Sequence, residues 1–229
     1  WSSWYDYNGS FNFSGMGGGV NVIIEAVSTD HLNLSSSTLN QSFIVDETLN
    51  APRSQLNSVT PMYSDQQDWV TDGSQFNFTL WNSTGIQYRL WDGAWSLWNT
   101  ADTNFSLTNL SDGIIYVEWY AYNGSLVEDT HNETYVFDGT DPSISIQIGE
   151  PYIGSRIAPW TSVNLTASDG SGVGLDVVQY RIWNGSGWNS WQNYSAPFNM
   201  TGYSGAITLQ AQSIDLLGNS SIANLSLVV

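Results

Sequence analysis

Five aspartates recur in the linker and loops of the C-terminal part of the chain. Asp138 and Asp141 stand in a linker, Asp169 and Asp176 in a loop, and Asp215 in a tight turn. Calcium takes roughly six to eight hard oxygen ligands, which carboxylates supply. If these loops meet at one end of a domain, Asp138, Asp141, Asp169 and Asp215 form a candidate calcium site. No DxDxDG loop is present, and Asp-Gly turns explain the same residues without a metal, so both interpretations stay open.

The chain has few residues that could support nucleophilic catalysis. There is no cysteine, and the two histidines, His31 and His131, lie in or after turns that are not equivalent. A serine nucleophile needs a base within hydrogen-bonding reach, and general acid–base work needs one tuned pair rather than many solvated acids. The sequence therefore predicts that the chain is not an enzyme and needs no catalytic cofactor.

Asparagines stand in N-x-S/T sequons far more often than chance allows. Of 21 asparagines, 16 are in sequons, whereas 49 Ser and Thr residues among 229 would give only about five. Asn and Ser/Thr also gather together in β-turns, which is the plainer explanation. We expect N-linked glycans at many of these sites, and hence an exported chain. The sequon asparagines are Asn8, Asn12, Asn33, Asn40, Asn77, Asn82, Asn104, Asn109, Asn123, Asn132, Asn164, Asn184, Asn193, Asn199, Asn219 and Asn224.

Tryptophans form two similar groups, each next to an arginine. Arg89 and Trp91, and likewise Arg181 and Trp183, are two apart, so on strands they share a face and are expected to stack as cation–π pairs. Each group ends in W-x-x-W, and a flat strand would place those two rings on opposite faces unless a bulge or turn intervenes. Packing between copies and a sugar-stacking platform are both open interpretations. The candidate contact residues are Trp91, Trp95, Trp98, Trp183, Trp188 and Trp191.

The tryptophan groups belong to an internal repeat. The stretch YRIWNGSGWNSW at 180–191 returns as YRLWDGAWSLW at 88–98, and its final W-x-x-W opens the chain as WSSW. A repeat of about 93 residues indicates serial domains of one kind. The landmarks that recur at this spacing are Trp1, Trp95 and Trp188; Phe11, Phe105 and Phe198; Val20, Ile114 and Ile207; and Val45, Phe137 and Val229.

The repeat predicts three units. Residues 1–45 correspond to the C-terminal half of a repeat, and residues 46–137 and 138–229 to two complete ones. The first unit has strands with apolar faces, including Phe11 and Phe13, but nothing to close a sandwich. We expect its missing strands to be supplied either by the same longer chain or by a neighbouring copy.

Alternating apolar residues predict antiparallel strands throughout, and nothing predicts a helix. In the third unit the expected strands are 143–148, 162–167, 177–183, 206–214 and 222–229. In the second unit the expected inward residues are Phe76, Phe78, Leu80, Tyr88, Leu90, Phe105, Leu107, Ile115, Val117, Trp119, Tyr135 and Phe137. The register of the strand around Ile115 is open by one residue, because Ile114 and Tyr116 alternate equally well. The fold class is all-β, with tandem Ig-like antiparallel β-sandwiches.

Three stretches of the third unit carry a family resemblance: DGTDPSISI, LTASDGSGVGLDVVQYRIWNGSGWNSW and LQAQSIDLLGN. They resemble the Ig-like or fibronectin-III-like repeats, notably of the OmpL47 type, of large secreted prokaryotic and especially archaeal surface proteins. The second unit matches more loosely, since it lacks SDGSGV and has YNGS in place of D-x-x-GN. The resemblance implies a fold and an extracellular location, and it implies no chemistry.

Charge limits the partners. The formal net charge is -17, with four arginines, no lysine and 21 acidic residues. Such a surface is repelled by nucleic acid and by anionic membranes, and no apolar run is long enough to span a bilayer. We therefore expect no nucleic acid as partner and no membrane insertion of this segment.

Two functions remain. The first is a structural or adhesive cell-surface glycoprotein whose serial sandwiches form part of a filament, a surface layer or a stalk. Its partners would be further copies, flanking repeats or surface glycans. The alternative is a carbohydrate-binding or spacer module of a larger exported enzyme.

Overall fold

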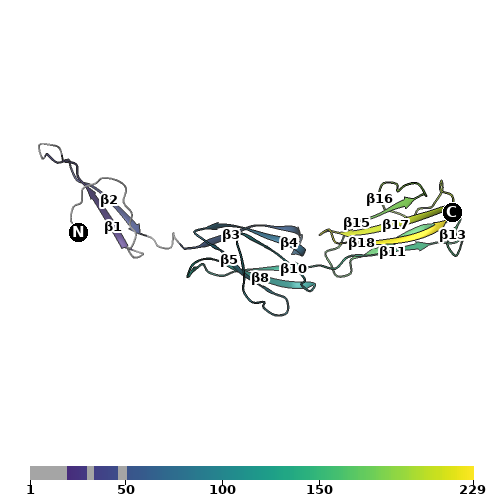
Figure 1. Cartoon of the computed structure of the whole chain (residues 1–229), viewed down its shortest axis with the longest axis horizontal. Helices are drawn as coiled ribbons and strands as arrows, with labels where there is room; N and C mark the ends of the chain where they lie inside the picture. The colour runs from purple at the N-terminus through teal and green to yellow at the C-terminus, as the bar shows by residue number, and fades with distance from the viewer. Residues whose placement is uncertain (1–19, 30–33, 46–50) are drawn as a thin grey trace.

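The computed structural model describes residues 20–29, 34–45 and 51–229 (Figure 1). Within these ranges all regular structure is β-strand, so the all-β prediction is confirmed and no helix of these ranges could span a membrane. The landmarks Trp1 and Phe11, the histidine His31 and the sequons at Asn8, Asn12 and Asn33 lie outside the described residues, as does Phe13.

A two-stranded antiparallel sheet comes first in the chain. It pairs β1 (Val20–Ala26) with β2 (Leu39–Val45), in a register that places Val20 opposite Val45. Both strands were expected from the alternation of apolar residues. β-branched residues recur along β1, as is usual for a strand.

The described part of the second unit, residues 51–137, contains eight strands. They are β3 (Arg53–Ser64), β4 (Asp68–Trp81), β5 (Gly85–Trp91), β6 (Asn99–Ala101), β7 (Asn104–Ser106), β8 (Gly113–Asn123), β9 (Leu126–Val127) and β10 (His131–Phe137). The path of hydrogen-bonded neighbours is β3-β4-β10-β8-β5-β6, with β7 on β4 and β9 on β8.

The strand β4 takes part in both layers of this sandwich. Its residues 75–81 and 68–70 pair antiparallel with β3, and Trp69 and Val70 also run parallel to the end of β10 on their other side. Between these parts, Gly73 has a φ of 79°, which a residue with a Cβ rarely adopts. The strand therefore bends there and connects the two layers.

The third unit repeats this layout with the layers separated. Its strands are β11 (Ser143–Ile148), β12 (Tyr152–Ile153), β13 (Arg156–Ile157), β14 (Val163–Ser168), β15 (Leu175–Trp183), β16 (Gln192–Asn193), β17 (Ala206–Asp215) and β18 (Ser220–Val228). One sheet is β11-β14 and the other is β12-β13-β18-β17-β15-β16. β13 runs parallel to β18, just as the start of β4 runs parallel to β10. Both units are Ig-like β-sandwiches.

Each sandwich has its own core. Phe76, Ile86 and Ile115 are fully buried in the second unit, and Val163, Leu209 and Ala211 in the third. The repeated tyrosine of the Tyr-Arg stretch stacks on a phenylalanine in both cores. The ring centroids of Tyr88 and Phe105 are 3.8 Å apart, and those of Tyr180 and Phe198 are 4.0 Å apart. The repeat in the sequence is thus a repeat of core packing.

The structure decides the open register of β8. Ile115, Val117 and Trp119 are buried, whereas Ile114 is 56% exposed. In the two sheets Tyr88 pairs with Trp119 and Tyr180 pairs with Ala211, which makes Ile115 the equivalent of Ile207. The landmark Ile114 was therefore wrong by one residue, because adjacent β-branched residues fit a strand equally well in either register.

A buried hydroxyl connects the layers in both units. Ser74 Oγ donates to the Pro61 carbonyl at 2.7 Å and accepts the Thr71 N–H at 2.9 Å. Thr161 Oγ1 makes the same pair of bonds, to the Pro151 carbonyl at 2.7 Å and from the Ala158 N–H at 3.1 Å. Both hydroxyl residues are fully buried, so these bonds satisfy backbone groups that water does not reach. Sequence reasoning did not identify this device.

Candidate functional site

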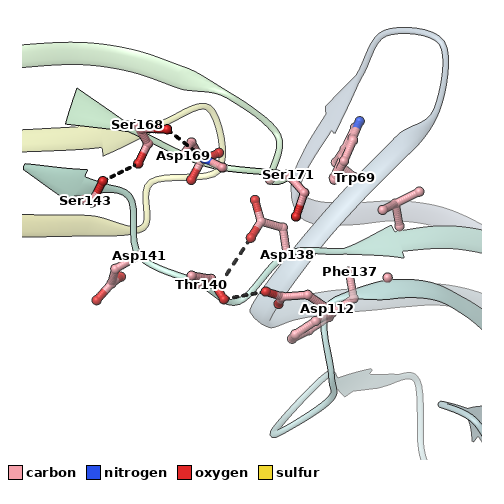
Figure 2. Close-up of a pocket in the computed structure, with 14 residues that line it drawn as sticks. Trp69, Asp112, Phe137, Asp138, Thr140, Asp141, Ser143, Ser168, Asp169 and Ser171 are labelled. Carbon is pink, nitrogen blue, oxygen red and sulfur yellow. Dashed lines mark hydrogen bonds between the residues drawn. The ribbon is translucent and has the colours of Figure 1, made fainter. Parts of the chain in front are cut away.

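The junction between the second and third units is built by four short segments. They are the bend in β4, the linker 138–142 between β10 and β11, the loop 169–174 and the turn 215–219 (Figures 1 and 2). Thr71 Oγ1 donates across the junction to Asn219 Oδ1 at 3.0 Å. The two sandwiches are thus in direct polar contact, in addition to their covalent link.

Asp138 binds to both units at once. Its N–H donates to the Val70 carbonyl at 2.9 Å, which extends the pairing of the second unit. Its Oδ2 accepts the Val173 N–H at 2.7 Å, which belongs to a loop of the third. Only 1% of the residue is exposed. The side chain therefore lies inside the junction rather than on its surface.

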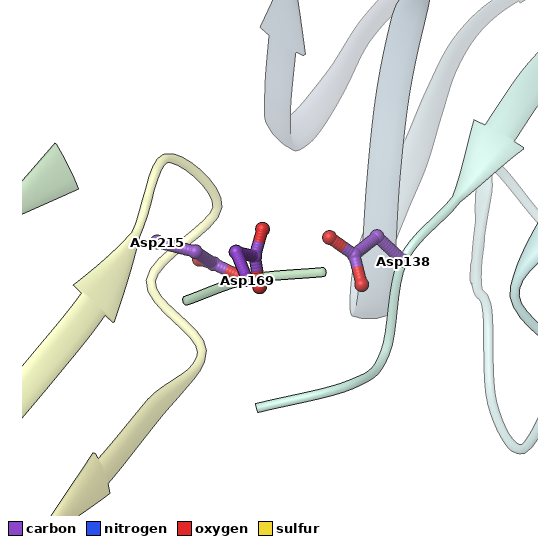
Figure 3. Close-up of side chains that lie close together, drawn as sticks. All are labelled: Asp138, Asp169 and Asp215. Atoms are coloured by element: carbon purple, nitrogen blue, oxygen red, sulfur yellow. The ribbon is translucent and has the colours of Figure 1, made fainter. Parts of the chain in front are cut away.

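Two more carboxylates face Asp138 from the third unit (Figure 3). One oxygen each of Asp138, Asp169 and Asp215 lies within 4.8 Å of the others. Asp169 Oδ2 accepts the Gly174 N–H at 2.7 Å, while Asp169 Oδ1 is buried without a hydrogen-bond partner. Asp215 Oδ1 accepts the N–H groups of the turn that follows it. Three of the four predicted calcium ligands are therefore brought together.

Gly172 is required by this arrangement. A Cβ at this position would lie 2.4 Å from Asp138 Oδ2 and 2.5 Å from Asp169 Oδ2, closer than real contacts permit. The two carboxylates can approach the loop from both sides only because the side chain is absent. This gives the glycine of the SGV stretch a physical reason.

Burial changes the acidity of the cluster. Desolvation, the largest cause, raises the pKa of the Asp138 carboxyl, and repulsion from Asp169 and Asp112 raises it further. Burial is also the main cause of a raised pKa at Asp169, with Asp215 and Asp112 adding to it. Backbone N–H donors oppose the shift at both residues. Each carboxylate is thus held at a cost in electrostatic energy.

The remaining candidate acids lie around the cluster. Asp141 does not join it, because its Oδ1 accepts the Ser220 N–H at 3.1 Å. Asp176 is exposed on β15. Asp112, which sequence reasoning missed, accepts the Gly139 N–H at 2.8 Å and the Thr140 hydroxyl. Asp112, Asp138, Asp141 and Asp169 all line one cavity of about 610 Å³ at the junction (Figure 2).

The arginine–tryptophan clusters differ from the expected pairs. The Arg89 guanidinium lies 4.4 Å from the ring centroid of Trp95 and 4.7 Å from that of Trp98. Arg181 is placed in the same way, 4.6 Å from Trp188 and 4.5 Å from Trp191. The pairing of Arg89 with Trp91 and of Arg181 with Trp183 was wrong, because side chains two apart on a strand project in parallel. The W-x-x-W segment instead returns across the strand and lies over it.

In the second and third units, each W-x-x-W segment is hydrogen-bonded to the preceding strand by the residue that follows its first tryptophan, and this places both rings on one face. Asn189, directly after Trp188, donates its N–H to the Ile182 carbonyl at 3.0 Å and accepts the Ile182 N–H on its Oδ1 at 2.5 Å. Ser96, directly after Trp95, makes the equivalent bonds to Leu90 at 2.8 and 3.1 Å. A side-chain acceptor thus replaces a backbone carbonyl, and the expected irregularity is present in both units.

The other predicted contact tryptophans flank these clusters. Trp91 contacts Tyr116 edge-on, with centroids 5.2 Å apart, and Trp183 is tilted against Trp188 at 5.8 Å. Trp98 also contacts Tyr120. All six predicted residues therefore lie on the outward face of the strands β5 and β15 or just beyond their ends.

Sequons in the described residues all lie at the surface or partly so. Ten of the asparagines are exposed: Asn40, Asn82, Asn104, Asn109, Asn123, Asn132, Asn184, Asn193, Asn199 and Asn224. Asn77, Asn164 and Asn219 are half-buried. Asn219 Nδ2 donates both its hydrogens, to the Asp138 carbonyl at 3.1 Å and to Asp215 Oδ2 at 2.7 Å. A glycan would replace one of these hydrogens, so this sequon is a poor acceptor in the folded chain.

A serine, an acid and a histidine meet at the far end of the second unit. Glu128 accepts the Ser54 hydroxyl and lies 3.5 Å from His131 Nε2. His131 stacks on Trp119, with centroids 5.2 Å apart. The acid stands between the serine and the histidine, so the imidazole is not placed to take the serine proton. This geometry supports no hydrolytic mechanism.

Comparisons with known proteins give structural similarity alone. No family model and no curated protein matches the chain. The fibronectin(III)-like modules of Clostridium thermocellum CbhA match with a TM-score of 0.41 and 11% identity, over 77% of this chain and 94% of that one. A tetra-tandem repeat in the extending region of a large adhesion protein matches with a TM-score of 0.31 and 21% identity, over 91% and 56%.

A third solved structure, the amphioxus IgVJ-C2 molecule, matches with a TM-score of 0.27 and 12% identity, over 70% of this chain and 99% of that one. These likenesses are loose. The Ig-like fold is therefore taken from the strands and sheets of the chain itself.

Proposed function

We propose that this chain is a structural segment of a cell-surface glycoprotein, in which serial β-sandwiches hold other parts of the protein at a distance or attach them to a surface. The observation that carries the proposal is the junction. Asn219 of the third sandwich bonds to Thr71 of the second and to Asp138 in the linker, so consecutive units are held by polar contacts as well as by the chain. These contacts restrict the relative motion that two domains joined only by a short linker would otherwise have, which suits a spacer.

The surface chemistry supports the same function. Described sequons are exposed or half-buried and none is fully buried, which leaves most of them open to glycosylation. The high negative charge keeps such a chain soluble. The finer assignment, an OmpL47-type repeat of an archaeal surface protein that forms a filament, a surface layer or a stalk, is part of this proposal and follows the sequence resemblance.

The test is made on the native protein. Protease treatment of intact source cells should release fragments that contain this segment, and the mass of each should exceed that of its own bare polypeptide, which is 25.3 kDa for these 229 residues, because of attached glycans. Protection of the segment in intact cells but not in lysed cells would refute the surface location. A mass equal to that of the bare polypeptide would refute the glycoprotein.

Carbohydrate binding is the second candidate, since three of the tryptophans in the arginine clusters, Trp95, Trp98 and Trp188, are between 36% and 39% exposed. The guanidinium groups already occupy one face of each ring, which leaves less area for a sugar. Affinity electrophoresis through gels that contain soluble polysaccharides distinguishes the two functions. A spacer should migrate as in an empty gel, whereas a binding module should be retarded, and less so after Trp95→Ala.

A further inference from the structure

The carboxylates of Asp138, Asp169 and Asp215 converge at the junction, and we propose that they bind one calcium ion that stiffens the contact between the second and third sandwiches. One oxygen of each lies within 4.8 Å of the others, although they come from a linker, a loop and a turn (Figure 3). The inference concerns this site alone and does not depend on where the protein is located.

Among the described residues, no cationic side chain pairs with these carboxylates. The chain has no lysine, and its ion pairs within the described residues are Arg89 with Glu118 and His131 with Glu128. Neither pair touches the cluster. Asp138 and Asp215 are only 1% and 2% exposed, so water screens their charges poorly. Three like charges, two of them buried and the third on the half-buried Asp169, are unfavourable without a counter-ion, and a divalent cation removes that penalty.

One carboxylate oxygen of the cluster has no hydrogen-bond partner. Asp169 Oδ1 is buried, and no N–H or O–H group donates to it. It is the one buried side-chain nitrogen or oxygen in that condition among the described residues. An unpaired buried carboxylate oxygen is costly, because it has lost water and gained nothing. A cation bound at this place supplies the missing interaction.

Distances and donor types favour calcium. The three ligand oxygens lie within 4.8 Å of one another, which is compatible with bonds of about 2.4 Å from all three to one calcium ion. Magnesium requires shorter bonds of about 2.1 Å and near-ideal octahedral geometry. All three ligands are oxygens, which does not suit zinc or copper as well as histidine or cysteine would. The adjacent cavity of about 610 Å³ has room for the waters that would complete the coordination.

An ion here would act on the junction directly. Asp138 follows β10, and its N–H bonds to Val70 of the second sandwich, whereas Asp169 and Asp215 stand in loops of the third. Binding of one ion by all three therefore adds a bond between the units. The relative motion of the sandwiches should decrease as calcium is added.

The test uses the 229-residue chain, freed of metal with a chelator. Calcium binding is measured by calorimetric titration, and terbium is used as a luminescent substitute, because Trp69 lines the same cavity and can transfer excitation to it. Asp169→Asn is the informative variant. Asp176→Asn, an exposed acid near the start of β15 just after the same loop, is the matched control. Trp69→Phe should lower the terbium signal while calcium affinity is unchanged.

We expect Asp169→Asn to weaken calcium binding by about tenfold or more, and Asp176→Asn to change it less than about twofold. Calcium at about one hundred times its Kd should raise the Tm of the wild type by roughly 10 °C and that of Asp169→Asn far less. With chelator present, Asp169→Asn should fold and be at least as stable as the wild type, since it removes one of three like charges that repel one another. Equal affinity of Asp169→Asn and wild type, or no calcium binding up to about 10 mM, would overturn the proposal.

Discussion

The hydroxyl of Thr71 donates a hydrogen bond of 3.0 Å to the side-chain oxygen of Asn219, and this bond connects two successive sandwiches. The same asparagine donates both hydrogens of its amide, one to the Asp138 carbonyl and one to Asp215 Oδ2. A single side chain thus holds the bend of one unit, the linker and the turn of the next. The presence of Asn219 is therefore explained by its hydrogen bonds in the junction and not by glycosylation.

The first prediction concerns which sequons carry glycans. Glycosylation of Asn219 would replace an amide hydrogen that the junction uses, so we expect this site to be empty. Asn199 and Asn184 are exposed and accept local hydrogen bonds on their side-chain oxygens, from backbone N–H groups and, for Asn184, also from the Ser186 hydroxyl, so we expect them to be occupied. Peptide mapping of native material by mass spectrometry measures the occupancy of each. A glycan found on Asn219 would contradict the described junction.

The buried hydroxyl of Thr161 gives the second prediction. Thr161→Val keeps the shape but leaves the Ala158 N–H and the Pro151 carbonyl without a partner, which should lower the free energy of unfolding of the third sandwich by about 1–3 kcal/mol. Thr166→Val, at an exposed position of β14, should change it by less than about 0.5 kcal/mol. Calorimetric scans of both variants measure the difference. Equal effects would show that the hydroxyl does not contribute.

Arg89 is the subject of the third prediction. Its Nε donates to Glu118 at 2.6 Å while its plane lies over two indole rings. Lysine keeps the charge but cannot stack flat, so Arg89→Lys should destabilise the second sandwich by about 1–2 kcal/mol, a figure reduced by solvent screening of a partly exposed pair.

Arg181→Lys is the internal comparison for this experiment. Arg181 donates to the neutral Gln210 instead of a carboxylate, at 2.7 Å. We expect the third sandwich to lose less stability than the second one does in Arg89→Lys. Calorimetry that resolves the two unfolding transitions gives both values. If the unfolding transition of the second sandwich is unchanged in Arg89→Lys, the stacking adds no stability.

Tyr135 predicts how stability changes with alkaline pH. Burial above all, and then its hydrogen bond to Glu133, raise the pKa of this phenol above its ordinary value of 10.0. Because the folded-state pKa exceeds that of the unfolded chain, the associated stability is fully present below about pH 10 and is lost as pH rises beyond it.

Tyr135→Phe keeps the ring that packs edge-on against Phe76 and removes the ionisable group. The free energy of unfolding of this variant should fall less steeply between about pH 9 and 11 than that of the wild type. Burial also raises the pKa values of Tyr88 and Tyr180, so part of the dependence of the free energy of unfolding on pH remains in this variant. Urea titrations at a series of pH values measure it. Parallel curves for the two proteins would contradict the assignment.

Strand positions could be predicted from the sequence because apolar and polar residues alternate along a half-buried strand. Ser143–Ile148 has the predicted bounds, and the inward residues of β17 are those expected from the alternation. The alternation named Ile115 as an inward residue but left the register open, because the adjacent β-branched residues Ile114 and Ile115 fit either one. Only packing against the rest of the core, which the sequence does not display, decides between them.

The candidate site could be predicted only in part. Aspartates in linker, loop and turn indicated a common end of a sandwich, and Asp138, Asp169 and Asp215 do meet there. The roles of Asp112 and Thr71 depend on how one unit is placed against the next, and no local pattern encodes that. The stacking of Arg181 on Trp188 and Trp191 likewise depends on the return of the chain after a bulge, which alternation along one strand does not describe.

The central claim is that the second and third sandwiches form one semi-rigid rod, and the distance between them tests it most directly. The chain has no cysteine, so Gln55→Cys and Ser226→Cys, both exposed, introduce a unique pair of spin labels. With calcium present, electron–electron double resonance should give one narrow distance distribution, which becomes broad when Thr71→Val and Asn219→Ala are added. A distribution as broad in the parent pair as in that variant would contradict the account.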